Sequence, residues 1–185
     1  AVAEELARRG VDEIQFDYVR YDDDGGIGEK YPGRTESITQ FVAQARENIR
    51  PSVYFSIDVY GRTLNKWNGK NIDPIGQNLV ELQFHVDYIS PMVYPSHYSN
   101  PKLVSDPYGC VKGALKTGQE RVQVELRPFI QAFHHSIPSS MTLPEYIKSE
   151  IKATKDAGTS GYLVWNPRSD YSSLWAALSN TSTNP

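Results

Sequence analysis

The chain has 185 residues, with 19 Lys and Arg against 22 Asp and Glu and a formal net charge of −3. This length suits one domain with a buried core, and the nearly balanced charge excludes a strongly basic surface for nucleic acid or anionic membrane. The single cysteine, Cys110, excludes an internal disulfide, and no apolar run reaches the roughly 20 residues of a membrane span.

Strand-like and helix-like segments alternate along the chain. Residues 1–9 have the pattern of an amphipathic helix in mid-course, and the first residue is not Met, so we expect a fragment of a longer protein. Runs rich in β-branched and aromatic residues predict strands at 13–20, 53–60, 86–93, 122–130 and 161–165. Apolar residues at helical spacing predict helices at 35–49, 76–84, 108–117 and 143–157.

This alternation predicts an α/β fold with a parallel sheet. The predicted strands begin roughly 35 to 40 residues apart, and eight such units need close to 300 residues, near the size of a (β/α)8 TIM-type barrel. We therefore predict that residues 1–176 form the last five βα units of such a barrel, and that 177–185 form a flexible tail. An open five-stranded sheet stays the alternative. In the barrel, the missing N-terminal strands or another chain complete the fold.

Charged residues near the ends of the first two predicted strands indicate a site. Asp17 and Arg20 end the first strand, and Asp58 is near the end of the second. In parallel α/β folds this end faces the ligand. Neighbouring strands lie about 5 Å apart, so two carboxyl groups there approach the separation of a retaining glycosidase pair. We expect Asp17 and Asp58 to be catalytic and Arg20 to bind substrate. The alternatives are a structural Asp17–Arg20 ion pair and a loop-capping role for Asp58.

The remaining strand ends carry polar and aromatic residues that we expect to bind a sugar. They are Tyr60, Tyr94, His97, Glu125, Gln131, Trp165 and Asn166. Trp165 would stack on a pyranose ring, although it and Tyr94 are equally compatible with a place in the core. Glu125 lies early in its strand and would alternatively pair with Arg127. No metal-ligand spacing and no nucleotide-binding glycine loop is present, so we expect neither a metal nor another cofactor.

Six motifs in a fixed order resemble a known family. They are FDYVRY, SIDVYG, IGQNLVEL, VDYISPMVYPSHY, RPFIQAF and LVWNP. Together they are similar to the glycoside-hydrolase-like barrel domains of many bacterial envelope and secreted proteins, from residue 3 to about residue 175. The family usually has a proline soon after FDYVR, where this chain has the loop 22–24. The resemblance implies a barrel that begins upstream of this chain and an extracellular or cell-envelope location.

A more distant likeness concerns the mechanism. The DxxDxDxE strand of chitinase-like barrels aligns loosely with residues 12–19, where Asp17 matches an aspartate but Val19 replaces the acid glutamate. The substrate-assisted chitinase mechanism would lack its proton donor. Asp17 and Asp58 are similar in position to the nucleophile and acid of barrels that use the fourth and fifth strands. We expect a glycoside hydrolase that cleaves a polysaccharide, and the alternative is a catalytically inactive carbohydrate-binding module.

Overall fold

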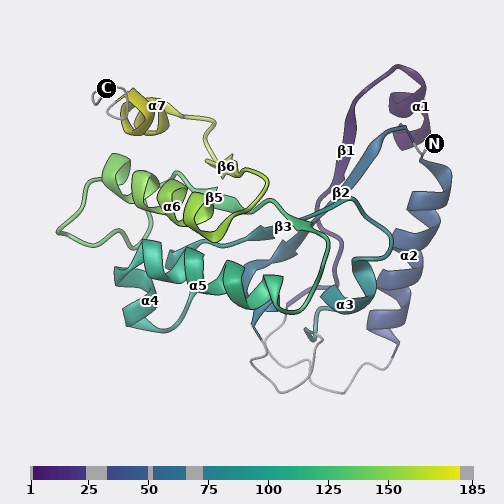
Figure 1. Cartoon of the computed structure of the whole chain (residues 1–185), viewed down its shortest axis with the longest axis horizontal. Helices are drawn as coiled ribbons and strands as arrows, with labels where there is room; N and C mark the ends of the chain where they lie inside the picture. Colours follow the sequence, from purple (N-terminus) through teal and green to yellow (C-terminus); the bar gives the residue numbers. More distant parts are fainter. Residues whose placement is uncertain (1, 24–32, 50–51, 66–72, 180–185) are drawn as a thin grey trace. The chain divides into compact units, whose positions relative to one another are not determined.

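The computed structural model describes residues 2–23, 33–49, 52–65 and 73–179 of the chain (Figure 1). The chain divides into two compact units. The first consists of Ala1–Pro91 and Thr117–Leu126, and the second of Met92–Lys116 and Arg127–Pro185. Both units contain parallel strands with helices beside them.

Strands and helices alternate through the first unit. Its elements are α1 (Val2–Arg8), β1 (Glu13–Phe16), α2 (Arg34–Asn48), β2 (Tyr54–Tyr60), the 3-10 helix η1 (Gly61–Leu64), α3 (Leu79–Leu82), β3 (Tyr88–Met92) and β4 (Glu125–Leu126). The last residue of β3, Met92, is assigned to the second unit. β1 pairs in parallel with β2, from Glu13 opposite Tyr54 to Phe16 opposite Ile57. β4 pairs in parallel with β3.

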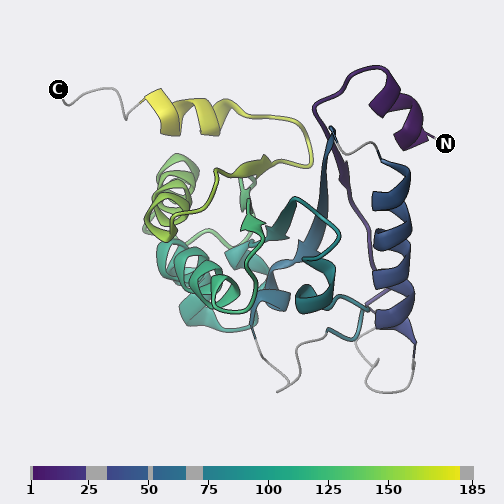
Figure 2. The same cartoon turned by 45° about the vertical axis from the view of Figure 1, so that its right-hand side comes forward.

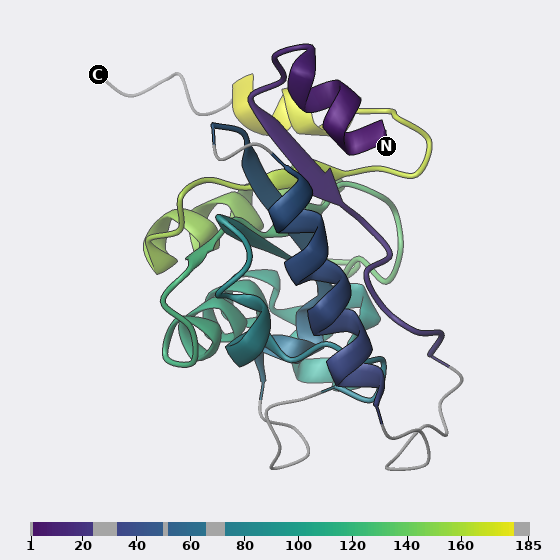
Figure 3. The ribbon, with the colours of Figure 1, turned by 90° about the vertical axis from the view of Figure 1, so that its right-hand side faces the viewer.

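The β1–β2 pair has one apolar and one polar face. Phe16 of β1 packs against Phe41 of α2 and Phe55 of β2, with ring centroids 5.9 and 5.0 Å apart. Figure 3 shows α2 running beside β1 on this side. Side chains alternate between the two faces of a strand, so Gln15 and Asp58 project from the opposite face, here called the inner face. The alternation therefore sends polar groups away from α2.

The second unit contains the remaining elements. They are η2 (Pro95–His97), α4 (Pro101–Ser105), α5 (Pro107–Gln119), β5 (Phe129–Gln131), α6 (Leu143–Ala157), β6 (Leu163–Trp165) and α7 (Ser172–Ser179). The last three residues of α5 are assigned to the first unit. β5 pairs in parallel with β6, and Phe129 also pairs with Met92 at the end of β3. α6 lies beside β5 and α7 (Figure 2).

An apolar core joins these helices to one face of the strands. Its buried members are Ile130, Ala132, Leu143, Ile147, Ile151, Leu174 and Ala177, with Val164 packed against them. Because Ile130 and Val164 point into this core, Gln131 and Trp165 project from the other face of β5 and β6. The two residues that we expect at the site are therefore on one face of their strands.

The strands differ in detail from the sequence prediction. The predicted first strand extends to residue 20, but β1 ends at Phe16 because Tyr18 has a φ of 57°, which no strand residue adopts. The predicted strand 122–130 is two short strands that break at Arg127–Pro128, where proline has no N–H to donate. β2 ends at Tyr60, as predicted.

The helices show a similar mixture. α2 and α6 match their predictions within one residue, whereas α3 is only one turn long, and α4 and α7 lack a counterpart in the prediction. The predicted tail begins at residue 177, but α7 continues to Ser179 and buries Ala177. The rest of the predicted tail, 180–185, lies outside the described residues.

The start of α6 gives a test of local stability. Thr142 Oγ1 accepts a hydrogen bond from the Glu145 N–H, and a Glu145 carboxylate oxygen accepts one from the Thr142 N–H. We expect Thr142→Ala to lower the free energy of unfolding by about 1 kcal/mol because this capping box is lost. Urea unfolding measures the change. Thr142→Ser, which keeps the hydroxyl, is the control, and an unchanged Thr142→Ala would contradict the role of the cap.

Candidate active site

The two expected catalytic carboxylates follow paired strand residues at one end of the first unit. The last register pair of β1 and β2 is Phe16 with Ile57, and Asp17 and Asp58 are the next residues on the two chains. Asp58 is only 6% exposed, whereas Asp17 is exposed. The backbone therefore brings both residues to the same level at the carboxyl end of neighbouring strands, which is the arrangement that the sequence predicts.

Hydrogen bonds between the strands hold the inner face in order. The Gln15 side-chain amide donates to Asp58 Oδ1 at 2.5 Å, and Ser56 Oγ donates to Glu13 Oε1 at 2.5 Å. Each bond satisfies a polar group that would be costly to bury alone. The bond from Gln15 fixes the direction of the Asp58 carboxylate. Asp58 therefore has a side-chain partner on β1, which the loop-capping alternative did not foresee.

Buried Gln77 joins the ends of both strands. Its amide nitrogen donates to the Val19 carbonyl at 3.0 Å and to the Asp58 carbonyl at 3.2 Å, while its Oε1 accepts from the Tyr60 N–H at 3.0 Å. One side chain thus satisfies three backbone groups that lie at or beyond the ends of β1 and β2. Gln77 holds the backbone of Asp58 in place relative to the segment that follows Asp17.

The alternative Asp17–Arg20 ion pair is absent from the part of the chain that the structure describes. Instead, Asp17 Oδ1 accepts a hydrogen bond from the Tyr18 N–H at 2.6 Å. The Arg20 guanidinium lies over two rings, 4.9 Å from the centroid of Tyr18 and 4.8 Å from that of Tyr60. Arg20 and Tyr60, both expected at the site, are therefore in contact with each other.

A second arginine also contacts the Tyr60 ring. Arg62 lies 4.9 Å from its centroid and makes two hydrogen bonds to buried Asp73, at 2.8 and 2.9 Å, and one to Asp23 at 2.6 Å. These carboxylates, Asp73 above all, raise the pKa of Arg62 above its ordinary value. The charge of Arg62 is thus balanced within the protein.

In the second unit, aromatic rings gather after β3 and β5. Tyr94 contacts His97 and Phe133 with ring centroids 5.4 and 5.6 Å apart, and His97 lies 5.9 Å from His135. Burial lowers the pKa of His97, and the neighbouring His135 lowers it further. His97, Tyr94, Phe133 and His135 thus form a cluster of rings after β3 and β5. Tyr94 itself is buried, as its core alternative predicts.

Gln131 is buried and has a full set of partners. Its Oε1 accepts from Ser96 Oγ at 2.7 Å, and its amide nitrogen donates to the carbonyls of Phe133 and His135 at 3.1 and 2.9 Å. A side chain with all its groups engaged has little left to offer a ligand. The structure therefore gives Gln131 a role in shaping the loop that carries Phe133 and His135, and direct substrate binding stays a prediction.

The other expected binding residues have different surroundings. Trp165, at the end of β6, is 46% exposed. Asn166 donates to the Ala132 carbonyl at 2.5 Å and accepts from the Arg168 N–H, so it shapes the turn after β6. Glu125 is exposed opposite Tyr88, where β3 and β4 begin. Its position at the starting end of the strands does not favour the binding role that we expected from the sequence.

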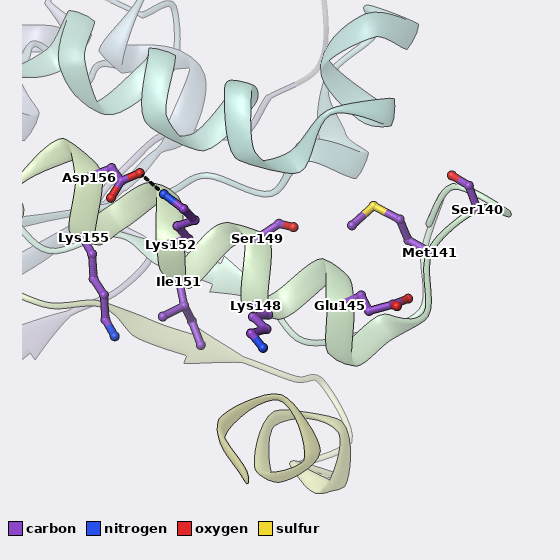
Figure 4. A pocket seen from close by; sticks show the side chains of 9 residues that line it. All are labelled: Ser140, Met141, Glu145, Lys148, Ser149, Ile151, Lys152, Lys155 and Asp156. Carbon is purple, nitrogen blue, oxygen red and sulfur yellow. Dashed lines mark hydrogen bonds and ion pairs between the residues drawn. The ribbon is translucent and has the colours of Figure 1, made fainter. Parts of the chain in front are cut away.

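A hollow along α6 is separate from all these residues. Figure 4 shows its lining side chains, which come from α6 and the segment before it, and Lys152 paired with Asp156 across one helical turn. The cavity measures about 680 Å³, and its lining residues are Ser140, Met141, Glu145, Lys148, Ser149, Ile151, Lys152, Lys155 and Asp156. No predicted site residue lines it, so it is not the candidate active site.

Neither a metal cluster nor a membrane helix is found in the described ranges. No three His, Cys, Asp or Glu side chains there are grouped to hold a metal ion. None of the described helices has the length and apolar character that crossing a membrane requires. Asp24, the last residue of the acidic run that follows β1, lies outside the described residues.

Sequence reasoning missed three residues that build the site. Gln15 and Gln77 are the partners of Asp58, and Phe133 completes the ring cluster around Tyr94. Gln15 had a readable signal, because a polar residue alternates there with Ile14 and Phe16 in a strand. Gln77 had none, since its partners are distant in sequence and the contact exists only in the fold.

Comparison with known proteins identifies the family. Residues 1–171 match the DUF4015 family, described as a putative glycosyl hydrolase domain. The chain belongs to this family. No curated protein sequence is significantly similar to it. The resemblance that the motifs carry is thereby confirmed.

Several solved structures resemble this DUF4015 domain at low sequence identity. The PgaB (BpsB) glycoside hydrolase domain of Bordetella bronchiseptica is 14% identical with a TM-score of 0.63, and the match covers 100% of this chain and 61% of the PgaB chain. The spore cortex-lytic enzyme SleL of Bacillus cereus is 13% identical with a TM-score of 0.65, and the match covers 96% of this chain and 51% of the SleL chain. A GH18 chitinase from Pseudoalteromonas aurantia is 16% identical with a TM-score of 0.59, and the match covers 96% of this chain and 65% of the chitinase chain.

These likenesses concern the fold. The domain is α/β, with five parallel strands in the order β1-β2-β3-β5-β6 that form a half-barrel, and β4 pairs with β3. The chain spans 51% to 65% of the length of these three structures. The predicted TIM-type barrel class is confirmed, and the chain corresponds to part of such a barrel.

Removal of Gln77 tests whether it holds the strand ends. We expect Gln77→Ala to lower the free energy of unfolding by about 2–3 kcal/mol, because it leaves buried backbone groups without partners. Gln77→Glu should also destabilise, since a carboxylate cannot donate to the carbonyls of Val19 and Asp58. Gln40→Ala, on the exposed side of α2, is the control for urea unfolding. Equal stability of the Gln77 and Gln40 variants would contradict this role.

Buried Glu150 gives a test by pH. Burial raises the pKa of its carboxyl well above the ordinary value, and only the Gln131 N–H, a donor to Oε1 at 3.2 Å, opposes this. A raised pKa in the folded state contributes stability below the unfolded value of about 4.3, and this contribution is lost as pH rises through the folded pKa.

We therefore expect Glu150→Gln to gain stability relative to the unaltered protein as pH rises from 4 to 8. Urea unfolding at several pH values measures the difference. Glu120→Gln removes an exposed carboxylate and is the control. A difference that stays constant with pH would show that Glu150 does not titrate in this way.

Proposed function

We propose that this DUF4015 domain carries the catalytic carboxylates of a glycoside hydrolase that cleaves a polysaccharide. The observation that supports this most directly is that Asp17 and Asp58 lie side by side, each directly after the last paired residue of β1 and β2, Phe16 and Ile57. Two carboxyl groups on adjacent strand ends suit the roughly 5–5.5 Å separation of a retaining pair. The nearly complete burial of Asp58 on a polar inner face is costly for a residue without a task.

The different surroundings of the two carboxylates suggest different roles. Asp17 is exposed and accepts a hydrogen bond from a backbone N–H, so its carboxylate is open to a substrate and suits a nucleophile. Asp58 is almost fully buried at the neighbouring strand end, a position that suits a general acid that donates to the leaving oxygen. In the second step the same carboxylate would take a proton from water. The amide of Gln15 would aim this group throughout.

Substitution of each carboxylate tests the proposal. In the full-length protein that contains this chain, we expect Asp17→Asn and Asp58→Asn each to lower kcat at least 100-fold, because each removes an acid, base or nucleophile. The assay is reducing-sugar release from a panel of polysaccharides, with NMR of the first product for its anomeric configuration. Asp12→Asn, at an exposed position before β1, is the matched control. Full activity of either catalytic variant would contradict the proposal.

A carbohydrate-binding module without catalysis is the second candidate. The exposed Trp165 and the rings of Tyr94, His97 and Phe133 favour it, since aromatic faces bind sugars without any carboxylate. This candidate predicts binding that survives both aspartate substitutions and no release of reducing ends by any variant. The first candidate predicts release that depends on both aspartates, so one set of proteins distinguishes them.

We further propose that the whole protein completes the barrel beside β1. A hollow of about 550 Å³ lies among α1, β1 and α2, where Leu6 and Phe41 are exposed on its wall. A preceding strand and helix, or another chain, would cover these apolar side chains and pair with the free side of the strand. An extracellular or cell-envelope location, which the motif resemblance implies, is part of the same proposal.

A further inference from the structure

Arg20 lies against two aromatic rings, and the described part of the chain gives its guanidinium no carboxylate partner. Its Cζ lies 4.9 Å from the Tyr18 ring centroid and 4.8 Å from that of Tyr60, a distance at which cation and ring attract each other. Among the described residues its guanidinium makes one hydrogen bond, to the Tyr21 carbonyl, and this bond is long at 3.4 Å. Among the described residues no carboxylate lies within ion-pair distance of Arg20. The guanidinium therefore keeps most of its N–H groups for an external acceptor.

The neighbouring arginine has different surroundings. Arg62, on the same Tyr60 ring, makes three hydrogen bonds to Asp23 and Asp73. Within the described ranges, Arg62 therefore has carboxylate partners and Arg20 has none. Because Arg20 is partly buried and follows Asp17 by three residues, its unused N–H groups are close in sequence to the proposed nucleophile.

The backbone at Tyr18 is strained in order to place its ring. Tyr18 has a φ of 57°, in the left-handed region that residues other than glycine rarely adopt. The residue is 74% exposed. Asp17 Oδ1 and the Arg20 N–H stabilise this turn through the Tyr18 N–H and carbonyl, at 2.6 and 2.8 Å. Such strain persists where surrounding contacts enforce it and is frequent at ligand sites. Here it presents an exposed ring beside a cation for which the described segments supply no carboxylate.

We propose that Arg20, between Tyr18 and Tyr60, binds the carboxylate of a uronic acid residue, so that the polysaccharide substrate is acidic. A guanidinium fork matches a planar carboxylate with two parallel hydrogen bonds, and the Tyr18 ring offers a face to the sugar that carries it. A singly charged group suits the site better than a phosphate dianion, because Asp17 and Asp22 are close by in the chain. This inference rests on the proposed glycosidase function and assigns its substrate class.

Binding without turnover tests the inference. The probes are tetrasaccharides of polygalacturonate, alginate and glucuronan, each with its carboxyl-reduced counterpart, and a neutral galactan that carries sulfate esters. Calorimetry measures binding to the full-length protein that carries Asp58→Asn, a substitution that prevents hydrolysis of the probe. We expect at least one uronate tetrasaccharide to bind more tightly than its reduced form, and Arg20→Gln to lower that affinity about 10- to 100-fold. Arg20→Lys, which keeps the charge but not the fork, should fall between.

The control and the outcomes separate this inference from the proposed function. Arg8→Gln removes the same charge from an exposed position on α1 and should leave binding unchanged. Equal affinity for every acidic probe and its reduced form, equal effects of the Arg20 and Arg8 variants, or tighter binding of the sulfated galactan would overturn the inference. Hydrolysis of neutral polysaccharides that needs Asp17 and Asp58 but not Arg20 would do so while the proposed function stands. Uronate binding through Arg20 without hydrolysis would refute only the function.

Discussion

The hydrogen bond from Gln15 to Asp58 is the interaction on which the candidate site depends. A carboxylate that is almost fully buried needs a donor, and β1 supplies one across the strand pair at 2.5 Å. The donor is in position because β1 and β2 are parallel and in fixed register, and because Phe16 and Phe55 occupy the opposite face against α2. The apolar packing of the outer face thereby sets the direction of the polar groups on the inner face.

Around this bond, the ends of the two strands are fixed by contacts that do not belong to the sheet. Gln77 satisfies the backbone beyond β1 and at the end of β2, and Asp17 stabilises the left-handed turn at Tyr18. Such contacts fix the position of the strand ends, which is what the proposed catalysis by positioned charges requires. In the second unit Gln131 has a comparable role, because it joins Ser96 to the loop that carries Phe133.

Much of this architecture follows from local sequence, and the rest depends on distant contacts. β2, α2 and α6 were predictable because their apolar periodicity is long and their ends carry clear signals, such as Gly158 after α6. The early end of β1 was not, since a tyrosine in the left-handed region gives no sign in the sequence. The placement of Asp17 and Asp58 side by side was predictable because both lie near the carboxyl ends of consecutive strands of a parallel sheet. The partners of Asp58 and the saturation of Gln131 required the folded chain.

The central claim is that Asp17 and Asp58 open together on one cleft as a catalytic pair, and the separation of their carboxyl groups in a crystal structure of the full-length protein tests it most directly. We expect a separation of about 5–5.5 Å at a shared opening, because a retaining pair requires it. A separation well beyond about 9.5 Å, or a closed ion pair around either carboxylate, would contradict the account.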